Sequence, residues 1–184
     1  MKSIVEKISR LLPGSVGVNQ TIGVEFNTEG VAFAHIQRHP SQQPLLLHCE
    51  FIPSSPNVDL AELLRTRLLK LGVPTIPANI VMEAGSYQLI LGEAPKVPAE
   101  ELAEALRWRV KDLVHFPIAE AIVDGFLLPE DSAKGTSRMA YAVVTQRKII
   151  EQQVGYATAA DLSLKNIDIP ELVLRNLAET CCDT

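Results

Sequence analysis

Cysteine and long apolar runs are both scarce in this chain of 184 residues. The three cysteines, Cys49, Cys181 and Cys182, are too few and too poorly spaced for a disulfide framework, and the adjacent pair cannot easily bridge with itself. Apolar runs last only a few residues, whereas a membrane-spanning helix needs about 20. Charged residues among the first dozen also interrupt any signal-peptide core. We therefore expect a soluble, unexported protein in a reducing cytoplasm.

Clusters of basic residues are also missing. The chain holds 17 Lys and Arg against 22 Asp and Glu, which gives a net charge of −5, and it has no block of consecutive basic residues. We therefore set nucleic-acid binding aside. Apolar content is plentiful, because 47% of the residues are hydrophobic. That content is enough for the core of one domain, or of one domain with a smaller inserted subdomain.

Alternating apolar residues predict a β-hairpin near the start of the chain. Two apolar stretches, 22–26 and 31–36, flank an Asn-Thr-Glu-Gly turn, and a third strand is expected at 45–52. Further strands are expected at 79–82, 87–91, 121–128, 139–145 and 164–169, and further helices from Pro98, at 147–159 and at 170–179. This order predicts an α/β domain with a mixed sheet.

A helix is also predicted between the third and fourth strands. Asp59 is expected at the N-cap, with Glu62 three residues later, and leucines at helical spacing follow. Gly72 and Pro74 should end this helix.

The first residues form an amphipathic pattern over 2–12. Its apolar positions are Ile4, Val5, Ile8, Leu11 and Leu12. Pro13 and Gly14 end the pattern. Two interpretations remain open for this predicted helix: contact with a membrane surface through its basic face, or packing on a core or a second copy.

Residues 23–31, Gly-Val-Glu-Phe-Asn-Thr-Glu-Gly-Val, resemble the first phosphate loop of actin-like ATPases. In such a loop the acid positions magnesium, and a glycine lets backbone N–H groups approach the phosphates. Here Glu25 replaces the usual Asp, Asn27 stands where Gly is expected, and Thr28 follows. The resemblance implies Glu25, Asn27 and Thr28 as the cofactor-binding residues of a degenerate loop. Glu25 is either a magnesium-positioning residue or an exposed carboxylate at the end of a strand.

A second resemblance lies after Pro98. In segment 105–121 a helix with Arg-Trp-Arg ends in a Phe-Pro-Ile turn before a strand, as in the pilus-assembly protein family PilM. Segments 141–148 and 161–172 are similar to later strands and helices of the same family. Among its relatives, the chain most resembles the MshI group of the mannose-sensitive haemagglutinin (MSHA) pilus. The type II secretion family GspL is a close rival.

The resemblance to the PilM family carries expectations about fold and activity. It implies an actin-like (ribonuclease H-like) fold of which one half is present, with residues 1–84 and 138–184 as a core subdomain and 85–137 as a small inserted α/β subdomain. The second phosphate loop and the adenosine-binding segment should then lie beyond Thr184. We therefore expect a protein that is not an enzyme and holds no cofactor, with ATP and magnesium limited to a longer protein.

The same resemblance implies a role in protein–protein contact. A scaffold or adaptor in pilus biogenesis would bind a PilN-like single-span inner-membrane protein, and an assembly ATPase is a further candidate partner. Its membrane association, at the inner face of the inner membrane, would be indirect. We expect Trp108, Phe116 and Pro117 to bind the partner's tail, although Trp108 could instead pack on the rim of its helix. The alternatives are an actin-like ATPase and a GspL-like secretion adaptor.

Other candidate chemistry lacks the required residue patterns. His35 and His39 follow an alternating strand, and no carboxylate or cysteine stands at ligand spacing, so we expect no metal site. The segment 134–137, Lys-Gly-Thr-Ser, lacks the preceding glycine of a Walker-type loop and is predicted to be a polar hairpin loop. A Gly-x-Ser-x-Gly nucleophile elbow is also missing.

Overall fold

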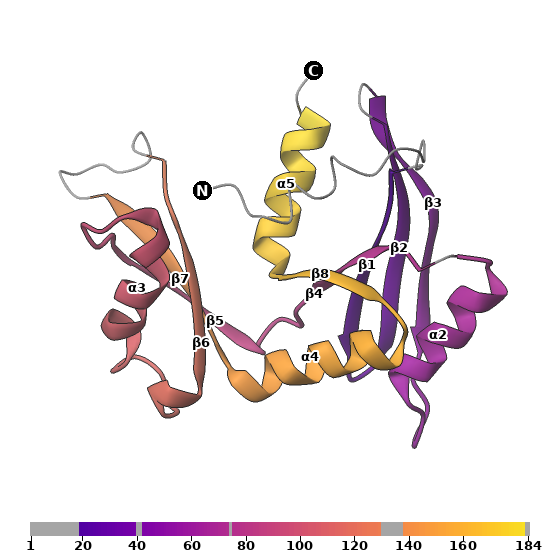
Figure 1. The fold of residues 1–184 in the computed structure, drawn as a ribbon, viewed down its shortest axis with the longest axis horizontal. Coiled ribbons are helices and arrows are strands. Elements are labelled where there is room, and N and C mark those ends of the chain that lie inside the picture. Colours follow the sequence, from indigo (N-terminus) through magenta and orange to yellow (C-terminus); the bar gives the residue numbers. More distant parts are fainter. Residues whose placement is uncertain (1–18, 40–41, 74, 130–137, 183–184) are drawn as a thin grey trace, which may run out of the picture.

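The computed structural model describes residues 19–39, 42–73, 75–129 and 138–182. The predicted helix at 2–12 and the loop at 134–137 lie outside these residues. Two β-sheets with their own helices make up the fold (Figure 1). The strands are β1 (Asn19–Asn27), β2 (Gly30–His39), β3 (Gln42–Pro53), β4 (Pro77–Val81), β5 (Tyr87–Glu93), β6 (Ala121–Leu127), β7 (Met139–Gln146) and β8 (Ser163–Asp168). The α-helices are α2 (Leu60–Lys70), α3 (Leu102–Val110), α4 (Arg147–Ala159) and α5 (Pro170–Cys182), and 3-10 turns occupy Ala99–Glu101 and Ile118–Glu120.

The larger sheet has five strands in the order β3-β2-β1-β4-β8. β1, β2 and β3 are antiparallel neighbours, whereas β1, β4 and β8 run parallel, so the predicted mixed sheet is confirmed. Ile22, Val24 and Phe26 alternate toward one face and are buried there. The other buried members of this core come from the neighbouring strands and from the helices α2 and α4: Val31, Phe33, Ala61, Leu64, Leu68, Ala78, Ile80, Ala157 and Ala160.

The smaller sheet has three antiparallel strands in the order β5-β7-β6. Helix α3 covers one of its faces. Its core consists of Leu102, Leu106, Val110, Ala121, Ala140, Ala142 and Val144. Gly125 of β6 lies directly under this helix, because a Cβ there would overlap Leu106 Cδ1 and would lie 2.8 Å from the Tyr141 carbonyl oxygen. The small residues on these strands therefore let α3 pack closely.

The structure corrects one predicted boundary. We expected residues 138–184 to belong with the core subdomain, but β7 pairs with β5 and β6, so the assignment of 139–146 is wrong. Apolar alternation predicts a strand without specifying its partners, because pairing depends on distant segments. β4 and β5 lie in different sheets, with Gly85 (φ +91°) in the connection between them.

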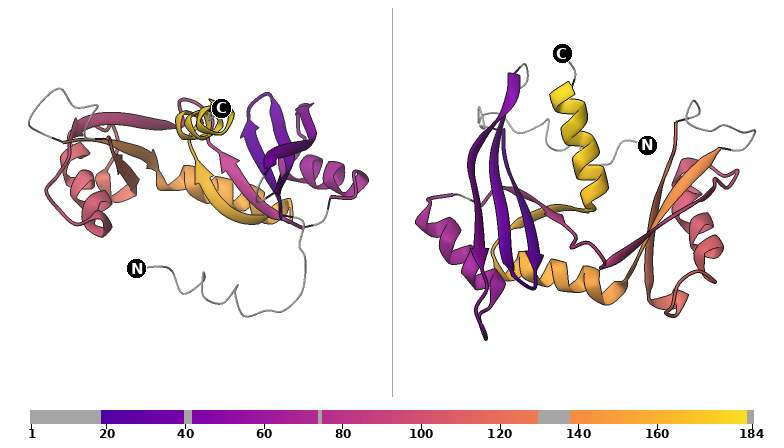
Figure 2. Two further views of the ribbon diagram at one scale, coloured as in Figure 1. Left: turned by 90° about the horizontal axis from the view of Figure 1, so that it is seen from above. Right: turned by 180° about the vertical axis from the view of Figure 1, so that it is seen from behind.

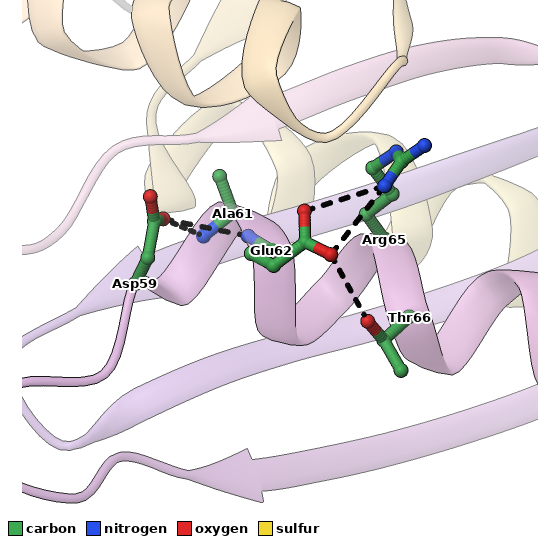
Figure 3. A network of polar contacts seen from close by, with 5 residues as sticks. All are labelled: Asp59, Ala61, Glu62, Arg65 and Thr66. Atoms are coloured by element: carbon green, nitrogen blue, oxygen red, sulfur yellow. Dashed lines mark hydrogen bonds and ion pairs between the residues drawn. The ribbon is translucent and has the colours of Figure 1, made fainter.

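Both ends of α2 follow from local chemistry, as predicted. Asp59 Oδ1 accepts hydrogen bonds from the backbone N–H groups of Ala61 (2.9 Å) and Glu62 (3.4 Å) (Figure 3). The Glu62 carboxylate also accepts bonds from Arg65 and Thr66 one turn later. Gly72, with φ +66°, ends the helix, and Val73 N donates to Leu68 O in a Schellman arrangement.

Helix α4 connects the two sheets. It contacts β6 and β7 of the smaller sheet and also β8 and α2, and α5 rises between the sheets (Figures 1 and 2). Tyr87 of β5 donates a hydrogen bond of 2.6 Å to the Glu171 carboxylate in the first turn of α5. None of the helices in the described ranges has the length and apolar character needed to cross a bilayer.

Candidate functional site: a polar cavity and an apolar groove

A cavity of about 620 Å³ opens beside the β1–β2 turn, and we call it the polar cavity. It lies between that turn, the loop that follows β3, the β4–β5 connection and α4. Its lining residues are Phe26, Asn27, Thr28, Ser54, Ser55, Pro56, Asn57, Val58, Leu60, Glu83, Ser86, Ile149, Gln152, Gln153 and Tyr156. The cavity therefore joins four segments that are far apart in the sequence.

Asn27 has a structural role in the β1–β2 turn. Its Oδ1 accepts hydrogen bonds from the backbone N–H groups of Glu29 (2.9 Å) and Gly30 (3.0 Å). Asparagine is suited to such turns because its short amide bonds to the backbone two or three residues later. The predicted loop residue thus uses its acceptor to hold the hairpin closed, while Thr28 at the turn is exposed.

Glu25 does not join the other two predicted cofactor residues. It lies within β1, half-buried, opposite Ala32 of β2 and Val81 of β4. Val24 and Phe26, its neighbours, point into the core, so Glu25 faces the other side of the sheet. Asn27 and Thr28 line the polar cavity and Glu25 does not.

The walls of the polar cavity are fixed by hydrogen bonds and stacking. Ser86 Oγ donates to Glu83 O (2.6 Å), and Thr145 Oγ1 donates to Ser86 O (2.7 Å), which ties the β4–β5 connection to β7. Elsewhere in the lining, the rings of Phe26 and Tyr156 stack on each other with centroids 4.8 Å apart. The cavity is therefore largely preformed.

A second cavity, of about 260 Å³, lies on the face of the smaller sheet opposite α3, and we call it the apolar groove. It is lined by Met82, Ile122, Asp124, Gly125, Phe126, Val143, Thr145, Ile150, Ile167, Asp168, Ile169 and Leu172. Its two carboxylates accept hydrogen bonds from neighbouring backbone, Asp124 from Gly125 N (2.7 Å) and Asp168 from Ile169 N (2.8 Å). The groove therefore offers mainly aliphatic and aromatic surface between the two sheets.

The predicted partner-binding residues lie away from the apolar groove. Trp108 is on α3, with 64% of its surface exposed, and Phe116 is half-buried against the core beneath that helix. Pro117 is exposed, and its carbonyl accepts a hydrogen bond from Glu120 N (2.9 Å). Because α3 covers the sheet face opposite the groove, these three residues lie on the α3 side of the smaller sheet. None of them lines the groove or the polar cavity.

Sequence reasoning missed the residues of the apolar groove, although a signal was present. Ile122 and Phe126 of β6, and Val143 of β7, are apolar at positions that alternate with the core residues. A strand that is apolar on both faces indicates that its second face is also covered or binds a partner.

His35 has a structural environment. It is buried, and its Nε2 lies 3.1 Å from Gln20 Oε1. Burial, with a further contribution from the charge of His48, lowers the pKa of His35 below its ordinary value. Within the described ranges, no group of three or more His, Cys, Asp or Glu is placed to hold a metal ion.

Comparison of sequences finds no matching protein-family model and no matching curated protein. Solved structures do match. A chain of the "PilM-PilN type IV pilus biogenesis complex" superimposes with a TM-score of 0.69 at 19% identity, over 86% of this chain and 51% of that chain. The cytoplasmic domain of EpsL, an inner-membrane component of the type II secretion system of Vibrio cholerae, superimposes with a TM-score of 0.55 at 14% identity. This match covers 81% of this chain and 57% of the EpsL chain.

The chain has the fold of that pilus-complex chain. The expected α/β fold with a mixed sheet is thereby confirmed, and the chain spans about half the length of the solved chains it matches. A Bacteroides thetaiotaomicron protein with an actin-like ATPase fold and unknown function has a TM-score of only 0.43 at 12% identity. That match covers 84% of this chain and 55% of the other. That TM-score is too low to support an argument. At these identities, likeness establishes fold and leaves function open.

Proposed function

We propose that this chain is a scaffold or adaptor in type IV pilus biogenesis, of the MSHA type. Its partner would be a PilN-like single-span protein of the inner-membrane assembly platform, and an assembly ATPase is a further candidate partner. The observation that carries the proposal is the fold match to a chain of the PilM–PilN complex, whose name records an assembly between two proteins. The apolar groove supplies a surface on which a short tail could bury apolar side chains.

The location follows from the proposed partner. The protein would act in the cytoplasm at the inner face of the inner membrane and would reach the membrane through the partner. An alternative is an adaptor of the GspL type in type II secretion, which the weaker match to the EpsL domain favours. These two alternatives differ in the partner and share the absence of bond chemistry.

The ATPase alternative has less support from the site. Asn27 Oδ1 is engaged in the hairpin turn, and Glu25 lies apart from the polar cavity. Among the residues that the structure describes, the cavity lining contains no Lys or Arg, and a nucleotide triphosphate ordinarily needs cationic or metal partners. We therefore propose that the chain is not an enzyme and holds no cofactor, and that ATP and magnesium would bind only in a longer protein.

Calorimetric titration with a synthetic peptide tests the proposal. The peptide is the cytoplasmic tail of the PilN-type protein encoded with this chain. Ile122→Asp would place a charge in the apolar groove, while Trp108→Ala and Phe116→Ala alter the outer surface of α3. If the groove holds the tail, Ile122→Asp should weaken binding by at least about tenfold and Trp108→Ala by less than about twofold.

Weaker binding in Trp108→Ala and Phe116→Ala, with little change in Ile122→Asp, would favour binding of the tail at Trp108 and Phe116, as the sequence predicted. A peptide from a secretion ATPase that binds more tightly than the PilN-type tail would favour the GspL-type alternative. Saturable binding of Mg-ATP that is lost in Glu25→Ala, with no peptide binding, would contradict the adaptor proposal.

A further inference from the structure

Gln153 of α4 lines the polar cavity with an unsatisfied polar group. The residue is only 6% exposed, and its Oε1 has no hydrogen-bond partner in the described part of the chain. Its neighbour Gln152 differs, because its Nε2 donates to the Tyr156 hydroxyl at 2.8 Å. Buried side-chain amides in folded proteins are nearly always paired with protein, water or ligand. Gln153 Oε1 itself is enclosed, so the amide must rotate for this unpaired acceptor to face the cavity and pair with a ligand that has N–H or O–H donors.

The charge of the polar cavity narrows the choice of ligand. Among the 15 described residues of its lining, Glu83 is the only one that carries a charge at neutral pH. An anionic ligand would meet this carboxylate, and no Lys or Arg of the described lining would balance it. A cation would instead gain a charge-assisted hydrogen bond. The remaining polar groups are neutral hydroxyls and amides from Thr28, Ser54, Ser55, Asn57 and Ser86, together with the side chains already described.

We propose that the polar cavity binds a guanidinium group, with Glu83 as its counter-charge and Gln153 Oε1 as an acceptor. Guanidinium is planar, stays charged, and carries five N–H donors and no acceptor, which matches several acceptors that surround one cation. The volume of about 620 Å³ exceeds what one side chain needs, so the chain or small molecule that carries the group also fits. The group could come from free arginine or from an arginine side chain of a partner.

The two segments that carry Glu83 and Gln153 are held in place independently. The β4–β5 connection is fixed by the bonds between Glu83, Ser86 and Thr145, and α4 packs its Tyr156 ring on Phe26. On the third side, Ser54 N donates to Glu29 O (2.7 Å), which holds the loop after β3 against the β1–β2 turn. Apart from the Gln153 side chain, little rearrangement is then needed for binding, which lowers its entropic cost.

NMR titration of the whole chain tests the proposal directly. The probe is N-acetyl-argininamide, and the matched probe is N-acetyl-citrullinamide, which has the same shape without the charge. We expect saturable shifts of the Gln153 side-chain amide and of backbone signals at 54–57 and 83–86, with a dissociation constant on the order of millimolar. The citrulline probe should bind at least about tenfold more weakly, because the charge-assisted bond to Glu83 is lost.

Two pairs of variants separate the site from the fold. Gln153→Met keeps the length of the side chain but removes the acceptor, and Gln88→Met, on β5 and outside the lining of the polar cavity, is its control. Glu83→Gln removes the counter-charge, and Glu151→Gln makes the same change on the exposed side of α4. We expect about tenfold weaker binding in Gln153→Met and Glu83→Gln, and less than about twofold change in the controls.

The source of the guanidinium is settled by a third probe, free L-arginine. Binding of free L-arginine at least about tenfold tighter than that of N-acetyl-argininamide would identify a small molecule, and tighter binding of N-acetyl-argininamide, whose capped backbone resembles a peptide, would identify a partner's side chain. The proposal is overturned if N-acetyl-argininamide at about 20 mM causes no NMR chemical-shift change in the folded chain. It is equally overturned if Mg-ATP or pyrophosphate shifts the same signals while the arginine probe does not.

Discussion

The two sheets of this molecule differ in how completely their faces are covered and in the size of their cores. The five-stranded sheet packs one face against α2 and α4 and buries twelve residues in a single core. Among the described helices, α3 packs most extensively on the three-stranded sheet, whose core has seven buried residues. Its second face stays only half-buried and lines the apolar groove. Local stability follows the number of buried apolar contacts, so the smaller sheet should open first.

The difference also separates two kinds of binding surface along α4. On one side of the helix, Gln153 and Tyr156 line the polar cavity beside the larger sheet, whose position is fixed by its core. On the other side, Ile150 lines the apolar groove against the smaller sheet. A rigid wall suits a ligand recognised by directed hydrogen bonds, whereas a half-covered apolar face gains stability when a partner completes its burial.

The largest loss of stability is expected from a substitution in the larger sheet, at Gly30 of β2. A Cβ on Gly30 would overlap the Ile52 carbonyl oxygen and lie 3.0 Å from Pro53 Cα, and backbone atoms cannot move aside as a flexible side chain can. Gly30→Ala should therefore lower the free energy of unfolding by about 3 kcal/mol, as measured by urea denaturation. Gly23→Ala is the control, because its Cβ would meet nothing within 4 Å. Equal losses in both variants would contradict this explanation.

Gly125→Ala applies the corresponding test to the smaller sheet. Its Cβ would meet Leu106 Cδ1, the end of a flexible side chain, and the Tyr141 carbonyl oxygen at 2.8 Å. We expect a smaller loss, about 2 kcal/mol, confined to the sheet that lines the apolar groove. Hydrogen exchange should speed up in β5, β6 and β7 and stay unchanged in β1 and β2. Uniform acceleration would show that the two sheets unfold as one unit.

Tyr87→Phe removes a contact between the smaller sheet and α5. The hydroxyl donates to Glu171 at 2.6 Å, and burial together with this carboxylate raises the pKa of Tyr87 to about 12. We expect a loss of about 1 kcal/mol at neutral pH in chemical denaturation. Because the fold favours the neutral phenol, its contribution is present below pH 10 and is lost as pH rises toward 12. The variant should lack this alkaline loss, and a wild-type-like loss in it would assign the effect to another group.

Local signals in the sequence predicted the individual elements but not their assembly. Two of these signals span only a few residues: the alternation of Ile22, Val24 and Phe26, and the N-cap at Asp59. The strand β1 and the start of α2 were therefore predicted correctly. The sheet that β7 joins depends on β5, about fifty residues earlier, and a strand pattern does not encode its partner.

The candidate sites were harder to predict for the same reason. The polar cavity combines four distant segments, so Gln153 has no local motif, whereas Asn27 and Thr28 were found through the phosphate-loop resemblance. That resemblance also proposed Glu25, which the alternation of β1 turns toward the opposite face. A motif fixes the order of residues along a strand, and the pleat then decides which of them meet.

The response to acid should distinguish the larger sheet from the smaller one. Burial lowers the pKa of His35, so the unfolded chain takes up a proton near pH 6.5 before the folded chain does. Stability is then complete above about pH 6.5 and falls as pH decreases, with a slope of at most about 1.4 kcal/mol per pH unit for one group. His35→Gln should flatten this slope in denaturation curves between pH 7 and 5. An unchanged slope would assign the acid response to another histidine.

The smallest effect concerns the edge of the larger sheet. The Glu50 carboxylate on β3 lies 2.8 Å from Arg67 Nε of α2 and 2.8 Å from His48 Nε2. These hydrogen bonds, Arg67 first, lower the pKa of Glu50, so its contribution is present above its ordinary pKa of 4.5 and is lost as pH falls below it. Glu50→Gln should lower the free energy of unfolding slightly at pH 7 and not at pH 3, because partly exposed ion pairs are weak. A loss that persists at pH 3 would mean that Glu50 acts through packing on α2, and the edge strand would then be held by the same apolar contacts as the core.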